Sequence, residues 1–181
     1  MYEIKRICNQ DIISNTELII TNSNVNNIHI NHCQKSELSL DMVHRDAFWL
    51  YQELYFLNKK VLVILLPCEI GNFKIVNNIH RSFCQKFGFN IIDMQKYYEN
   101  KDLNYFDFTF DGAHQFHFIT QELAKNIIQN IDNFYLPKKL HIKNNNPKIK
   151  ICTPKEMKFQ GLLQENHLKN SKYDESCYKF L

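Results

Sequence analysis

The chain has 181 residues and a formal net charge of +3, with 44% hydrophobic and 23% charged residues. This length suits about one domain with a substantial core, and this composition excludes wholesale disorder. The lysines are scattered through the sequence and form no basic block, so neither nucleic acid nor a membrane surface is expected as a partner.

The sequence shows no charged-then-apolar leader and no apolar run near the roughly 18 residues that a membrane span needs. Its six cysteines are widely spaced, and no CxxC pair occurs. We therefore expect a reduced cytoplasmic protein whose cysteines pack in the core instead of forming bridges.

The first predicted strand is ELIIT, at positions 17–21, an apolar and β-branched run that the polar turn NSNVNN follows at once. An amphipathic helix comes next, with Ser36 as a candidate N-cap. Its apolar positions recur at helical spacing: Leu40, Val43, Ala47, Leu50, Leu54 and Leu57.

VLVILLP, at positions 61–67, is apolar up to its proline, which favours a strand that is covered on both faces. A second helix is predicted before Gly88, which supplies its stop, and FNIID, at positions 89–93, is predicted as another buried strand. A third helix follows a polar stretch. The apolar stripes of these helices are Val76, Ile79, Phe83 and Phe87 in the second, and Phe116, Ile119, Leu123, Ile127, Ile131 and Phe134 in the third.

Strands and helices that alternate over short connections predict an α/β fold, with a parallel sheet between two layers of helices. The pattern weakens beyond Pro137. We expect an α/β domain over 1–136, and a carboxyl-terminal appendage or the start of a further module over 137–181. No glycine-rich phosphate loop is present, so no nucleotide or other cofactor is expected.

Two polar clusters fall at the predicted carboxyl ends of strands, where parallel sheets place their chemistry: TNSN after the first strand and DGAH before the last helix. An aspartate three residues before a histidine on a turn can fold back to fix its tautomer and stabilise its charged form. Asp111 and His114 are therefore candidates for an orienting acid and a general base. The alternative is that Asp111 only turns the chain into the helix and His114 is a surface residue.

A metal site is a further alternative, since imidazole, thiolate and carboxylate are common zinc ligands. The residues that would form it are His29, His32, Cys33, Asp111, His114 and His117. Their spacing matches no strong zinc signature, so the sequence predicts no metal.

The order of these blocks resembles the SGNH (GDSL-type) hydrolase family over roughly 16–131. The matching blocks are ELIITNSN, a long helix, VLVILLP, a second helix, FNIIDM and DGAHQFHFITQELAKNI. The resemblance implies a flavodoxin-like α/β/α fold and a serine ester or acyl hydrolase that acts on a small-molecule or carbohydrate ester. It assigns the triad acid to Asp111, the base to His114 and an oxyanion donor to Asn24.

The sequence departs from the family at its start, because no GDS nucleophile block occurs and only MYEIKRICNQDIISN precedes the aligned region. After His114 it also has Gln115 and Phe116 where the family usually has proline and asparagine. Three explanations follow: the carboxyl portion of a longer hydrolase, a non-catalytic interaction or assembly module, or, ranked last, a compressed enzyme with Ser23 as nucleophile. We expect an incomplete or inactive domain that self-associates or takes its missing strands from a companion chain.

Overall fold

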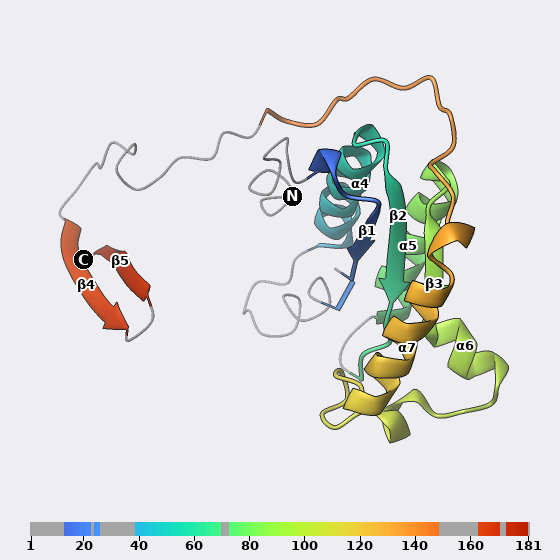
Figure 1. Cartoon of the computed structure of the whole chain (residues 1–181). Helices are drawn as coiled ribbons and strands as arrows, with labels where there is room; N and C mark the ends of the chain where they lie inside the picture. Colours follow the sequence, from blue (N-terminus) through green and yellow to red (C-terminus); the bar gives the residue numbers. More distant parts are fainter. Residues whose placement is uncertain are drawn as a thin grey trace. The chain divides into compact units, whose positions relative to one another are not determined.

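The structure is a computed structural model, and it describes residues 13–22, 24–25, 39–69 and 73–148, together with the backbone of 163–170 and 173–180 (Figure 1). The chain divides into two compact units, Met1–Pro147 and Lys148–Leu181. The candidate site lies in the first unit. We describe each unit by itself.

The first unit is built on a parallel sheet whose three strands lie side by side in chain order (Figure 1). They are β1 (Leu18–Thr21), β2 (Lys60–Leu65) and β3 (Asn90–Asp93). Ile19 lies opposite Val61, and Ile91 lies opposite Val63. In the central strand β2 every residue after Lys60 is buried, which confirms that both of its faces are covered.

Helices cover both faces of this sheet, as the sequence predicts. Two of them, α4 (Leu40–Phe56) and α5 (Phe73–Phe87), pack on the face to which Val61, Val63 and Leu65 point. On the other face, α7 (His117–Gln129) packs against Leu62 and Ile64. The connections β1–α4–β2 and β2–α5–β3 run in the same direction across the sheet and have the same hand. Both connecting helices therefore lie on one face.

The outer strands are more exposed than the sequence predicts. Among the described residues, β1 and β3 each pair only with β2, so they form the two edges of the sheet. Ile20 is 51% exposed and Ile91 is 40% exposed. The prediction of a buried strand at 89–93 therefore holds only for Phe89 and Asn90, and no residue of β1 is buried.

The helix ends follow local chemistry. Ser39, not Ser36, caps α4: its backbone is extended and its hydroxyl accepts from the Met42 N–H. Ser36 lies outside the described residues. Gly88 has φ +68 directly after α5, which confirms the predicted stop. The third helix ends earlier than predicted, because Ile131 lies in the 3-10 turn η2 (Ile131–Asn133) and Phe134 beyond it.

A short helix, α6 (Met94–Asn100), and a 3-10 turn, η1 (Tyr105–Phe108), occupy the stretch that the sequence analysis left as polar. Asp93 caps α6 by accepting from the Lys96 N–H at 3.1 Å. Tyr98 and Tyr105 are buried in a cluster of their own, with ring centroids 5.2 Å apart. With seven residues, about two turns, α6 is too short for a helical period to be visible in the sequence.

The first compact unit extends about ten residues beyond the boundary expected at 136. The segment 137–147 lies along α4 and α5: the Lys138 N–H donates to the Phe87 carbonyl, and the Leu140 N–H donates to the Tyr55 hydroxyl, both at 2.9 Å. Asn146 donates to the Trp49 carbonyl at 2.8 Å. Backbone and amide contacts such as these leave no periodic signal in a sequence.

The second unit contains an antiparallel pair, β4 (Leu163–Asn170) and β5 (Tyr173–Phe180), in which Asn170 lies opposite Tyr173. The sequence analysis did not predict this hairpin. Within the part of the chain that the structure describes, no helix has both the length and the apolar character that a membrane crossing requires.

Candidate functional site

The DGAH motif forms the tip of a tight antiparallel loop between η1 and α7. The loop is closed by a bridge between Thr109 and Gln115 and by hydrogen bonds from Phe116 N–H to Phe108 O (3.0 Å) and from Phe110 N–H to His114 O (3.1 Å). Thr109 and Gln115 are buried, whereas the residues on either side of them are more exposed. Alternate side chains therefore point to opposite faces, as in any paired strand.

Asp111 and His114 contact each other at this tip. Asp111 Oδ2 lies 2.6 Å from His114 Nδ1, and Asp111 Oδ1 accepts the His114 and Ala113 N–H groups at 2.7 and 3.0 Å. These hydrogen bonds, that of the His114 backbone first, lower the pKa of Asp111 from 3.8 to about 2. The carboxylate is thus ionised at neutral pH and holds the imidazole by its Nδ1 atom.

The imidazole itself faces outward. The His114 side chain is 70% exposed, and Phe110 stacks on its ring with 5.6 Å between centroids. Among the described residues, no hydrogen-bond partner contacts Nε2. An imidazole that is oriented through Nδ1 and open at Nε2 has the geometry of a general base.

The loop is fixed to the end of β2. The Glu69 N–H donates to the Gly112 carbonyl at 2.9 Å, and the Tyr105 hydroxyl donates to the Ala113 carbonyl at 3.3 Å. Ala113 is buried in a small apolar cluster with Cys68, against which Val25 also packs. The chain after β1, the chain after β2 and the DGAH loop therefore meet on the carboxyl side of the sheet, as expected for parallel strands.

We expect Gly112→Ala to destabilise the loop, because Gly112 has φ +76 and an added Cβ would collide with the Glu69 side chain. The cost should be about 1–3 kcal/mol, and the Asp111–His114 contact should loosen. Urea unfolding measures the first effect, and imidazole chemical shifts of His114 in NMR measure the second.

The matched control is Gly88→Ala, which also has a positive φ and a Cβ collision, here with Lys138. Gly88→Ala should lower stability without moving the His114 resonances. Equal shifts in the two variants would mean that the loop does not depend on Gly112.

Asn24, the predicted oxyanion donor, is completely buried after β1. Its amide donates both hydrogens within the protein, to the Leu66 carbonyl at 2.6 Å and to Asn77 Oδ1 at 2.7 Å. In this conformation the amide has no hydrogen left for a substrate. Asn24 thus has a structural role here, and the oxyanion role stays a prediction that this geometry does not favour.

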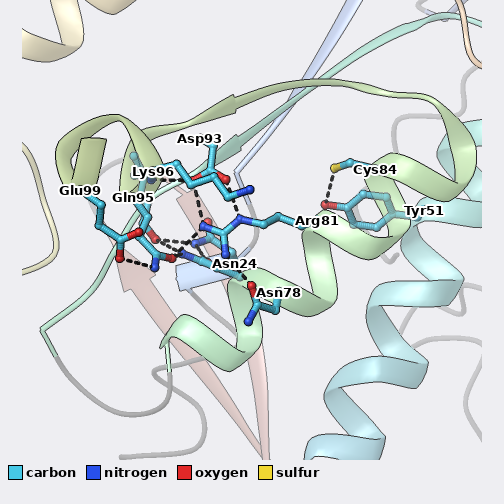
Figure 2. A network of polar contacts seen from close by, with 11 residues as sticks. Asn24, Tyr51, Asn78, Arg81, Cys84, Asp93, Gln95, Lys96 and Glu99 are labelled. Carbon is cyan, nitrogen blue, oxygen red and sulfur yellow. Dashed lines mark hydrogen bonds and ion pairs between the residues drawn. The ribbon is translucent and has the colours of Figure 1, made fainter. Parts of the chain in front are cut away.

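Asn24 belongs to a network of polar side chains at the carboxyl ends of the strands (Figure 2). Asn77 donates to Gln95 at 3.0 Å, and Gln95 also accepts from Arg81 at 2.9 Å. Arg81 forms a two-pronged ion pair with Asp93, at 2.6 and 3.0 Å. Burial raises the pKa of Asp93, but the hydrogen bonds from Arg81 and the Lys96 N–H outweigh it and lower that pKa below 3.8.

A second polar group lies between α4 and α5, near this network in Figure 2. The Tyr51 hydroxyl lies 2.9 Å from His80 Nδ1, and the Cys84 thiol donates to it at 3.7 Å. Burial lowers the pKa of His80 to about 4 and raises that of Cys84 to about 12. His80 is therefore neutral, with Nδ1 accepting the tyrosine proton.

The sequence analysis missed these buried polar residues. One signal was available: His80 lies four residues after Val76 and three before Phe83, at the helical spacing of the predicted α5 stripe, and Asn77 lies three residues before His80.

The alternative nucleophile and half of the alternative metal ligands are not among the described residues. Ser23, His29, His32 and Cys33 lie outside the described residues. Within 13–22, 24–25, 39–69 and 73–148, no three histidine, cysteine or acidic side chains gather in a way that would hold a metal ion.

The fold and this site define an α/β protein with an exposed aspartate–histidine pair on the carboxyl side of a parallel sheet. Comparisons of the chain with family models, with curated proteins and with solved structures found no match.

Proposed function

We propose that this chain is an SGNH-type esterase or acyl hydrolase domain of the flavodoxin-like kind, and that Asp111 and His114 supply the acid and base of its site. The observation that carries the proposal is the 2.6 Å contact between Asp111 Oδ2 and His114 Nδ1, on a loop that leaves Nε2 open. The serine nucleophile is expected from outside the described residues.

The chemistry follows from the two side chains. His114 Nε2 takes the proton of a serine hydroxyl while the serine oxygen bonds to the ester carbonyl, and Asp111 stabilises the imidazolium. The tetrahedral intermediate then expels the alcohol, which receives the proton from Nε2. In a second cycle water, activated by the same nitrogen, breaks the acyl–serine bond and releases the acid.

The sheet also supports the proposal. In the resemblance, the nucleophile block and the block after it lie on two strand units that precede the strand before Asn24. Among the described residues the outer edge of β1 is unpaired. A further parallel strand at this edge, from an upstream segment or a companion chain, would end on the same side of the sheet as His114.

The base role predicts a definite tautomer for His114. In the wild type Nδ1 should carry the proton, held by Asp111, and Nε2 should be bare at a pH where the ring is neutral. Asp111→Asn should abolish this preference, because an amide can hydrogen-bond either tautomer. Nitrogen chemical shifts of the His114 imidazole report the tautomer in the wild type and in Asp111→Asn. His117, which is exposed and lies three residues further on, is the internal control: its chemical shifts should be the same in both proteins. A wild-type His114 protonated at Nε2 would contradict the base role.

Fluorophosphonate labelling followed by peptide mass spectrometry then locates the nucleophile. For an incomplete site, the folded chain alone should show no labelled serine, because an aspartate–histidine pair without its nucleophile loses most of the roughly 10⁶-fold catalysis of a triad. A label on Ser23 that disappears in His114→Ala would instead show a compressed but complete site in this chain.

The hydrogen bonds of the Asn24 amide favour a second candidate function, a non-catalytic interaction or assembly module that retains the hydrolase scaffold. Its two amide hydrogens bind protein acceptors, where an oxyanion donor would leave one for the substrate. The two functions differ in the labelling experiment, because only a hydrolase can give a serine label that disappears in His114→Ala, whereas a module that keeps the Asp111–His114 contact would show the same tautomer.

A further inference from the structure

We infer that the groove between β3, α6 and α7 binds the linear apolar chain of the substrate. The groove has a volume of about 460 Å³, within the usual range for small-molecule sites. Its walls are mainly apolar, formed by Ile92, Met94, Leu103, Phe108, Phe118 and Leu123. That this chain belongs to an ester substrate rests on the proposed function. That the groove binds an alkyl chain rests on the groove itself.

The charged and amide groups of the groove are few and lie on its solvent side. Glu122 and Asn126 are exposed, on the same face of α7 as the groove. Glu122 is paired with Lys125, and Asn126 donates to the Glu122 carbonyl. These groups leave the interior without a charge of its own, which favours a neutral hydrocarbon chain over a charged or sugar-like ligand.

The groove is continuous with the loop that carries His114. In the antiparallel loop, Phe108 lies across from Phe116 and Phe110 across from His114, so alternation places these four side chains on one face. Phe116 stacks on Phe118, with 6.1 Å between ring centroids. Phe108 and Phe118 are thus members of both the groove and the aromatic surface around the imidazole.

The spacing along this surface fits an ester whose chain lies in the groove. Phe108 and Phe110 flank Thr109, whose backbone is extended, so their Cα atoms lie about 7 Å apart at the usual rise per residue. The carbonyl of a bound ester would therefore lie a few bonds beyond the groove when it reaches the imidazole. A chain of roughly six to ten carbons would occupy the groove and leave the ester outside it.

The test uses n-alkanols from hexanol to decanol as neutral probes of the whole chain, with binding measured by NMR titration. Each added methylene that enters the groove should tighten the dissociation constant about fourfold, until the groove is filled. The shifted resonances should be those of Phe118 and Leu123.

The variant is Phe118→Ser, in which the removed ring is 61% exposed and its loss should not affect folding. It should weaken octanol binding about tenfold or more. Its matched control is Ile128→Ser, on the same helix, 69% exposed and outside the groove. Ile128→Ser should bind octanol like the wild type.

Two results would overturn the inference: binding that does not depend on chain length, and equal binding by Phe118→Ser and Ile128→Ser. Self-association that only Phe118→Ser abolishes, without alkanol binding, would assign the groove to a second copy of the chain. The His114 tautomer does not depend on the groove, so the hydrolase proposal and the groove proposal fail by separate measurements.

Discussion

The free energy of unfolding is expected to fall by about 3 kcal/mol between pH 7 and pH 4 on account of His80 alone. His80 is fully buried between α4 and α5, and burial lowers its pKa from 6.5 to about 4. In the unfolded chain the imidazole takes up a proton below pH 6.5, whereas in the folded chain it stays neutral until about pH 4. The unfolded state therefore binds more protons in this window, and stability decreases as the pH falls through it.

The packing around His80 explains why it stays neutral. Its Nδ1 accepts from the Tyr51 hydroxyl, and that hydroxyl accepts from the Cys84 thiol. Burial raises the pKa of both Tyr51 and Cys84, so neither becomes an anion that would compensate a charged imidazole. A proton on Nδ1 would also leave the tyrosine proton without its acceptor.

Urea unfolding of the wild type, His80→Gln and His44→Gln at pH 7, 6, 5 and 4 isolates this effect. His80→Gln should remove most of the stability loss in this window, although it is less stable than the wild type at pH 7. His44 is an exposed histidine of α4, so His44→Gln should keep the wild-type dependence of the unfolding free energy on pH. If the unfolding free energy of His80→Gln fell with pH as steeply as that of the wild type, His80 would not be the source of the pH dependence.

The elements that the sequence predicts are those whose apolar residues form a continuous run or recur at helical spacing. The all-apolar run of β2 and the helical stripes of α4 and α5 predict the central strand and the layer of helices on one face of the sheet. Edge strands are as apolar in sequence as central ones, so the exposure of Ile20 and Ile91 depends on their neighbours in space. The segment 137–147 is held by hydrogen bonds to α4 and α5 and by the packing of Leu140 and Ile142 on the core, and neither gives a periodic signal in the sequence.

In the candidate site, too, local contacts could be predicted from the sequence and contacts between distant residues could not. The contact between Asp111 and His114 is local, spanning three residues of one turn, and the spacing alone made it an expectation. The position of the Asn24 amide depends on Leu66 and Asn77, which are 42 and 53 residues away in sequence. A resemblance in the order of blocks does not specify where such a side chain points.

Replacing Asn77 by alanine is expected to cost about 3 kcal/mol of stability, because Asn77 joins the ends of all three strands. It is completely buried in α5, accepts from Asn24 after β1, and donates to Leu66 O after β2 (3.3 Å) and to Gln95 after β3. In Asn77→Ala one Asn24 amide hydrogen loses its acceptor in a dry site, and the missing side chain leaves a small cavity. Both effects lower the stability of the folded state.

The chain offers a matched control in the adjacent residue. Asn78 is exposed and, among the residues that the structure describes, accepts a hydrogen bond from Arg81 alone, at 2.6 Å. Asn78→Ala should change the free energy of unfolding by less than about 0.5 kcal/mol, since surface contacts of this kind contribute little. Urea unfolding of both variants measures the difference.

Asn77→Ala should also release the Asn24 amide, which then has one hydrogen for a ligand or for water. Val25 packs against the cluster that contains Ala113, so a shift of the chain after β1 should reach the loop of His114. We therefore expect the His114 imidazole resonances to move in Asn77→Ala and to stay in place in Asn78→Ala. If the two variants were equally stable, with unchanged His114 shifts, the polar network would not be what holds the carboxyl ends of the strands and the Asp111–His114 loop together.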